Sequence, residues 1–192
     1  MPVQIGAKTH SFNDPTGLLS DCHRRIEMFL GTFAAVAEVI DRAPSEETVQ
    51  ALQAALRYFS QAAPKHTADE EESLFPRLRE VHDPEVTSAF SALHRLEKDH
   101  EAVSHLHAEV ERLAAQYVAH GSLSVTERQA FRAAVKNLQE MYKEHISVED
   151  SIVFPLAAQM LSESDKAAIA HEMAQRRQAA VVVGIDIPRA GQ

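Results

Sequence analysis

The feature that most constrains the fold is a segment that occurs twice, 79 residues apart. The first copy, HTADEEESLFP, runs from His66 to Pro76, and the second, HISVEDSIVFP, runs from His145 to Pro155. Each copy has a histidine, a glutamate four residues later, a second acid directly after it, and a Phe-Pro pair. Residues four apart on an α-helix lie on one face, roughly 6 Å apart along the axis. Each copy therefore predicts a helix that presents one imidazole and one carboxylate to the same partner.

Length and composition favour a single all-α domain. A chain of 192 residues can bury a sizeable core without disulfides, and glycines are few. The formal net charge of -9 argues against a phosphate backbone as partner, so we expect no nucleic acid. The single cysteine, Cys22, excludes an intrachain disulfide and an iron-sulphur cluster held by this chain alone. No apolar run approaches the length of a membrane span, and the first residues lack a signal-peptide core, so we expect a soluble cytoplasmic protein without membrane contacts.

Capping signals and apolar periodicity divide the chain into four long helices and one short one. Asp14-Pro15 and Asp83-Pro84 each read as an N-cap followed by proline, and Ser124 with Glu127 forms a capping box. We expect helices over 15–43, 46–82 with kinks at its two prolines, 84–120, from 125 past 156, and 162–178. The predicted organisation is an extension (1–13), an up-down-up-down four-helix bundle (14–161), a short C-terminal helix (162–178) and a tail (179–192).

Four histidines are expected at one level of such a bundle, because within each helical hairpin the two histidines lie equally many residues from the turn. His23 lies 20 residues before the expected end of the first helix, and His66 lies 20 residues after the start of the second. The same counting brings His100 and His145 to that level across the next two hairpins. The first and third helices also align when His23 is placed on His100, so the chain resembles two copies of one helical hairpin about a pseudo-two-fold axis.

Four imidazoles and two carboxylates that converge in an apolar interior predict a metal cage. A carboxylate has two oxygens and can bridge two cations, which offsets charge that an apolar core would otherwise penalise. A donor set without thiolates suits iron or manganese better than a structural zinc site. The predicted metal ligands are His23, His66, Glu70, His100, His145 and Glu149.

These residues make the chain similar to the hemerythrin family, specifically to its bacterial HHE cation-binding branch. The resemblance covers roughly residues 14–178 and includes the segments EEESLFPRL, EDSIVFPLA and LSESDKAAIAHEMAQRR. It implies two iron ions bridged by two carboxylates and an oxo or hydroxo group, in a site that reacts with dioxygen or related small molecules. Iron is favoured over manganese and zinc on this basis.

The sequence departs from the oxygen-carrying members in two places. Carriers have a further histidine four residues after the third-helix ligand, where this chain has Ser104. That difference predicts an open or water-filled coordination position. The second bridging acid follows its histidine by five residues in carriers, which is Asp150 here, whereas the HHE pattern uses Glu149. We favour Glu149 because it repeats the spacing of His66 and Glu70.

Further residues near the predicted site are open to several interpretations. Glu27 either reaches the metal layer from the first helix or points to solvent. Tyr142 either orients a ligand or packs in the core, and His107 lies too far along its helix to share the metal but can line a path to it. Asp69, Glu71 and Glu72 are expected on solvated faces, with Glu71 as an alternative outer contact of the site.

Two functions are compatible with this site. The first is a di-iron protein that binds or senses dioxygen, nitric oxide or iron. The alternative is a di-iron oxidoreductase that acts on peroxide or nitric oxide; the chain has no nucleophile motif or catalytic triad. The apolar tail, 179–192, either packs across the bundle, pairs with a second subunit to give a homodimer, or stays unstructured.

Overall fold

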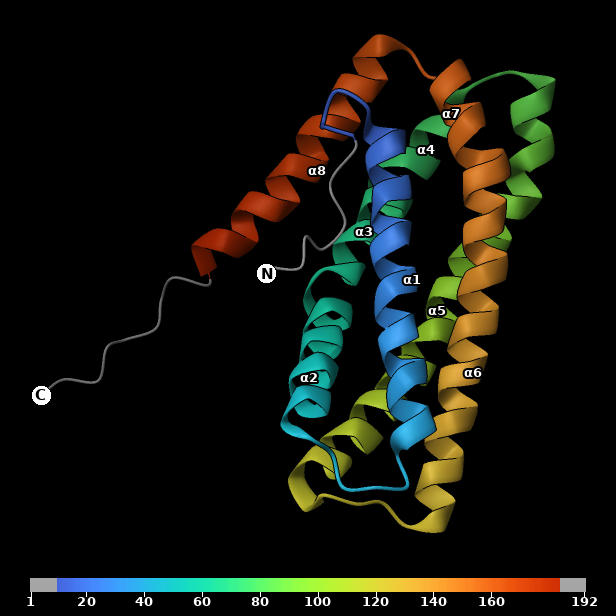
Figure 1. The fold of residues 1–192 in the computed structure, drawn as a ribbon. Helices are drawn as coiled ribbons and strands as arrows, with labels where there is room; N and C mark the ends of the chain where they lie inside the picture. The colour runs from blue at the N-terminus through green and yellow to red at the C-terminus, as the bar shows by residue number, and fades with distance from the viewer. Residues whose placement is uncertain (1–9, 184–192) are drawn as a thin grey trace, which may run out of the picture.

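The computed structural model describes residues 10–183, with side chains to 177, and this part of the chain is helical with no strand. Four long helical segments form an up-down-up-down bundle, and a fifth helix starts near one end and runs obliquely along its side (Figure 1). This confirms the predicted all-α architecture. The first bundle segment is α1 (Pro15–Val39), and the third is α5 (Pro84–His120). The second joins α2 (Glu46–Gln61), α3 (Ala63–Asp69), η1 (Glu70–Leu74) and α4 (Phe75–Glu80), and the fourth joins α6 (Val125–Val148), η2 (Glu149–Val153) and α7 (Phe154–Met160).

Side-chain caps start the helices where the sequence predicts them. The carboxylate of Asp14 accepts the amide hydrogen of Gly17, and that of Asp83 accepts the amide hydrogen of Glu85, each directly before a proline. Ser124 and Glu127 form the reciprocal capping box at the start of α6. These contacts satisfy amide groups that have no partner within the helix, which fixes the point where each helix begins.

Two helix boundaries differ from those expected. Helix α1 ends at Val39 rather than near Ala43, because in a continued helix the ring of Pro44 would clash with the carbonyl of Ile40 and could donate no hydrogen bond to it. The second segment is interrupted at Ala62, two residues before Pro64, where the amide of Lys65 bonds to the carbonyl of Ala62 at 3.2 Å in a tighter turn. A proline has no amide hydrogen, so the regular pattern cannot continue through it.

The Phe-Pro pairs of the repeat follow short π-helical turns. In η1 the amide of Phe75 bonds to the carbonyl of Glu70, and in η2 the amide of Phe154 bonds to that of Glu149, so both bonds span five residues. A proline ring clashes with the carbonyl four residues before it, and a wider turn relieves that clash. The repeat therefore encodes a π-turn in each copy, and each π-turn begins at the glutamate of the motif.

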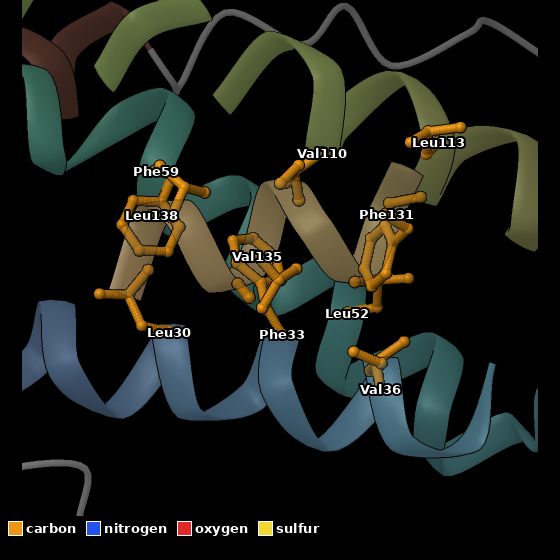
Figure 2. Packing of buried hydrophobic residues seen from close by; sticks show 14 of the residues in the cluster. Leu30, Phe33, Val36, Leu52, Phe59, Val110, Leu113, Phe131, Val135 and Leu138 are labelled. Atoms are coloured by element: carbon orange, nitrogen blue, oxygen red, sulfur yellow. The ribbon is translucent and has the colours of Figure 1, made fainter. Parts of the chain in front are cut away.

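The core has two apolar clusters, one on either side of the histidine level. One cluster includes Ile26 and Ile146 and extends toward the α1–α2 and α5–α6 loops. In this cluster α1 and α6 face each other, and α2 and α5 pack on either side of them (Figure 2). The labelled side chains are Leu30, Phe33, Val36, Leu52, Phe59, Val110, Leu113, Phe131, Val135 and Leu138. The other includes Leu19, Leu96 and Val153. A polar layer between two packed cores is held rigidly from both sides.

Helix α8 (Glu163–Val183) packs beside α1 and α3 at one end of the bundle (Figure 1). It continues past the expected end at Gln178. Asp69, which we expected on a solvated face, is fully buried beneath it and bonds to Arg176 at 3.0 Å and to Arg177 at 2.7 Å. The prediction was wrong because the partners of Asp69 lie more than 100 residues away in sequence.

Expectations for residues 1–9 and for the tail beyond 183 lie outside the described residues. Among the described residues, no helix combines the length and apolarity that crossing a membrane requires.

Candidate metal centre

The structure brings all six predicted ligand side chains together at one level of the bundle. They form two groups, each of two histidines and two glutamates, with ligand atoms within 4.8 Å of one another. One group contains His23 and His66, the other contains His100 and His145, and both contain Glu70 and Glu149. The four histidines come from four different bundle segments, as the counting of helix arms indicated.

Each glutamate faces both groups. One carboxylate oxygen of Glu70 lies 3.2 Å from Nε2 of His66, and the other lies 3.5 Å from Nε2 of His100. The oxygens of Glu149 lie 3.1 Å from Nε2 of His145 and 3.1 Å from Nε2 of His23. A carboxylate in this position has one oxygen for each of two cations.

The histidine nitrogens converge in pairs. Nε2 of His23 is 3.1 Å from Nε2 of His66, and Nε2 of His100 is 3.0 Å from Nε2 of His145. Two imidazole nitrogens that point at each other across so short a distance suit a shared cation, because lone pairs from both rings can then bind it.

Buried carboxylate oxygens that accept no hydrogen bond indicate whether metal ions fit between these side chains. Glu70 and Glu149 are fully buried, and all four of their carboxylate oxygens lack a hydrogen-bond partner among the described residues. Burying a carboxylate without compensation is strongly unfavourable. Histidine and carboxylate donors without thiolates match the preferences of iron or manganese. The donor set and the unsatisfied oxygens therefore fit metal ions at this position.

Electrostatics of the protein alone shift the pKa values of the two carboxylates in opposite directions. Burial, reinforced by the nearby Glu149, raises the pKa of Glu70 well above its usual range. Burial acts the same way on Glu149, but the close contacts of its carboxylate with the imidazoles of His145 and His23, each at 3.1 Å, outweigh it and lower the pKa of Glu149. Burial also holds the pKa of His66 well below its usual value, which leaves a neutral imidazole able to bind a cation. Bound cations would favour the ionised form of both carboxylates, since metal ligands bind in their deprotonated form.

The second acid of each repeat orients a histidine from another segment. Asp150 accepts from Nδ1 of His23 at 2.9 Å and is itself held by the hydroxyl of Ser20 and the guanidinium of Arg24. Glu71 contacts Nδ1 of His100 at 2.8 Å. A carboxylate on Nδ1 directs Nε2 toward the metal. Asp150 therefore lies outside the ligand groups, in the orienting position, and Glu149 lies inside them.

The two halves of the site differ at one pseudo-symmetric position. Nδ1 of His145 lies 3.6 Å from a carboxylate oxygen of Asp99, whereas Nδ1 of His66 has no hydrogen-bond partner among the described residues. The alignment of the first and third helices pairs Asp99 with Cys22, a buried thiol that accepts from Arg25. Asp99 was missed by sequence reasoning, although its place next to His100 was a signal for it.

Other predicted residues lie around the six rather than among them. Glu27 is half-exposed and pairs with Arg24 at 2.8 Å, outside both ligand groups. The exposed hydroxyl of Ser104 donates to the carbonyl of Glu101 at 2.7 Å. Tyr142 borders the histidines, and its hydroxyl is 3.0 Å from Nε2 of His107.

Comparison with known proteins is consistent with this geometry. Residues 14–157 match the sequence profile of the Hemerythrin HHE cation binding domain, which spans the bundle and all six side chains. The chain belongs to the hemerythrin HHE cation-binding family. Its histidine and glutamate groups are therefore candidate cation ligands of a metal-binding domain.

A relative of this HHE domain protein extends over nearly the whole chain. This chain is 25% identical over 169 residues to an uncharacterized protein of Haemophilus influenzae (strain ATCC 51907 / DSM 11121 / KW20 / Rd), and the match covers 88% of this chain and 92% of that protein.

Proposed function

We propose that this protein holds two iron ions and uses them to bind a small ligand such as dioxygen or nitric oxide. The observation that supports this most strongly is the placement of Glu70 and Glu149, each with one oxygen toward either histidine pair. One cation would leave half of these buried oxygens without compensation. Two cations account for all of them.

Iron is the favoured metal because of the donors and the family. His23, His66 and the two glutamates offer one ion four protein ligand atoms, and His100, His145 and the same glutamates offer four to the other. Six-coordinate ions would keep positions for exogenous ligands on both sides. When bound, iron supplies redox chemistry and affinity for diatomic ligands that the side chains alone do not have.

The residues around the ions would exclude large molecules. The histidines enclose a cavity of only about 30 Å³, and a single water needs about 10–15 Å³ of such volume. An organic substrate does not fit this space. This size favours binding or sensing of a diatomic over turnover of a larger substrate.

Stopped-flow absorption spectroscopy of the iron-loaded, reduced protein tests the proposal. Mixing with dioxygen or nitric oxide is expected to produce a charge-transfer band that is absent from a His66→Ala variant. Loss of the band on removing the gas would identify reversible binding. A reduced di-iron protein whose spectrum does not change with either gas would contradict the proposal.

The alternative is an oxidoreductase that acts on peroxide or nitric oxide, and the available positions on both ions favour it. Ser104 contributes no imidazole to the second ion, so both halves have the same donor set. Repeated turnover of hydrogen peroxide that disappears in both His66→Ala and Glu149→Gln variants would favour this function. A reaction that stops after one equivalent per protein would favour binding.

A further inference from the structure

Two surface grooves adjoin the small cavity between the histidines. The first, here called the α3–α5 groove, measures about 360 Å³ and lies beside α3, α5 and α6. The second, the α1–α6 groove, measures about 370 Å³ and lies between α1 and α6. These two grooves are the candidate routes by which a diatomic ligand reaches the cavity.

The α3–α5 groove shares most of the outer wall of the cavity. Five side chains line both spaces, namely Ala63, Thr67, His100, Val103 and Tyr142. The α1–α6 groove shares only Tyr142 and Ile146 with the cavity. Small rotamer changes at Val103 or Thr67 would therefore connect the α3–α5 groove with the histidines, since both are only partly buried.

The two grooves also differ in charge. Four charged side chains line the α1–α6 groove: Arg24, Glu27, Lys143 and Asp150. The α3–α5 groove has one charged residue, Glu111, and its other lining is largely apolar: Phe59, Ala63, Pro64, Val103 and Ala108. Dioxygen and nitric oxide are uncharged and partition into apolar surroundings, whereas charged groups hold hydration water in place.

The floor of the α3–α5 groove is neutral and closed by a polar contact. Nε2 of His107 and the hydroxyl of Tyr142 satisfy each other at 3.0 Å, and the His107 ring lies 4.4 Å from that of Phe59. Burial lowers the pKa of His107 to about 4, so its imidazole carries no charge at neutral pH. Because His107 and Tyr142 bond to each other and are uncharged, the floor of the groove offers no binding site for a charged ligand.

We propose that the α3–α5 groove, floored by Phe59, His107 and Tyr142, is the route by which uncharged diatomic ligands reach the metal cavity. The proposal rests on the proposed function for the identity of the ligand. It assigns Ser104 to the mouth of the route, because its side chain is exposed and lines the groove but not the cavity. Val103 forms the constriction between the two spaces.

Nitric oxide binding kinetics of the iron-loaded full chain test the route. Ser104→Trp covers the mouth, and both the association and the dissociation rate constants are expected to fall by about tenfold, with the affinity unchanged. Val103→Ala widens the constriction and is expected to raise both rates. Gln139→Trp, an exposed substitution in the α1–α6 groove, is the matched control and should leave both rates unchanged. Slowing by Gln139→Trp without slowing by Ser104→Trp would overturn the proposal.

A second measurement does not depend on iron chemistry. In the zinc-loaded protein, dissolved dioxygen is expected to enhance the nuclear relaxation of the Ala63 and Val103 methyl groups more than that of Leu30, which lines the α1–α6 groove. Ser104→Trp should reduce the enhancement at Val103. The chain has no natural tryptophan, so fluorescence reports whether the new indole covers the groove. Greater enhancement at Leu30 would overturn the route, whereas failure of the unmodified iron protein to bind nitric oxide would overturn only the proposed function.

Discussion

Glu149 and Asp150 are adjacent in sequence but have different environments. Glu149 is fully buried between His23 and His145, and Asp150 reaches Nδ1 of His23 from outside. Two neighbouring acids on a helix point about 100° apart, so one can face the ions while the other supports a ligand. The preference for Glu149 that came from the repeat agrees with this placement.

Substitution of the two acids should therefore have unequal effects. We expect Glu149→Gln to abolish binding of at least one metal ion, because the amide has one oxygen where the carboxylate would offer one to each of two ions. Asp150→Asn should retain both ions with about 10–100-fold lower affinity, since it weakens only the orientation of His23. Competition with a chelator measures both affinities. A larger loss in Asp150→Asn than in Glu149→Gln would contradict the roles assigned to them.

His107 provides a pH-dependent prediction away from the metal ligands. Burial lowers its pKa from 6.5 to about 4 in the folded chain. Between these values the unfolded chain binds a proton that the folded chain does not, so stability present above about pH 6.5 is lost as the pH falls toward 4. Relative to His107→Gln, the unmodified protein should lose about 2 kcal/mol more unfolding free energy between pH 7 and pH 5. Parallel urea-unfolding profiles of the two proteins over that range would show that His107 titrates normally.

At the scale of the elements, α8 is attached to the metal level through a buried ion cluster. Arg176 and Arg177 both bind Asp69, whose side chain is fully buried and directly precedes Glu70. Arg176 also donates to Ser73 at 2.9 Å, within the π-turn η1. The C-terminal helix thus supports the segment that positions one of the two shared glutamates.

Removing both arginines should be costly because Asp69 would remain buried without a partner. We expect Arg176→Ala combined with Arg177→Ala to lower the free energy of unfolding by about 3–5 kcal/mol. Arg112→Ala, which breaks an exposed pair with Glu109, should change the free energy of unfolding far less, because solvent screens that pair. Chemical denaturation compares the two. Equal losses would indicate that Asp69 becomes hydrated when α8 loses its arginines.

At the scale of the whole molecule, the architecture could be predicted from the sequence because two independent patterns agreed. The three-four spacing of apolar residues and the capping signals defined the helices, and the equal distances of His23, His66, His100 and His145 from the hairpins defined their alignment. The resulting bundle and the convergence of the six side chains both appear in the structure. Shortening of α1 at Val39 did not disturb the alignment, because the level of the histidines is set by packing of the two apolar clusters.

Features that depend on contacts distant in sequence could not be obtained in this way. The burial of Asp69 requires α8 to lie against α3, and no local pattern near Asp69 indicates that. The π-turns require knowledge of how a proline changes the preceding turn, and the Phe-Pro pairs predicted only altered helix shape. The contact of Asp99 with His145 depends on the rotation of α5 relative to α6.

The metal ions should also stabilise the molecule as a whole. The two apolar clusters meet at a layer whose buried carboxylates are unsatisfied in the protein alone. Ligands that bind only the folded state add about 2.7 kcal/mol at a hundredfold excess over their dissociation constant. Chelation is therefore expected to lower the melting temperature, and re-addition of ferrous iron to restore it. A melting temperature that is insensitive to chelator would contradict a metal-bound interior.

The central claim is that two metal ions lie in this layer and share Glu70 and Glu149. Elemental analysis of the purified full chain after gel filtration in metal-free buffer tests it most directly. The account predicts two metal ions per chain, principally iron, and fewer than two in Glu149→Gln. One ion or none per chain in the unmodified protein, unchanged on loading with ferrous iron, would contradict it.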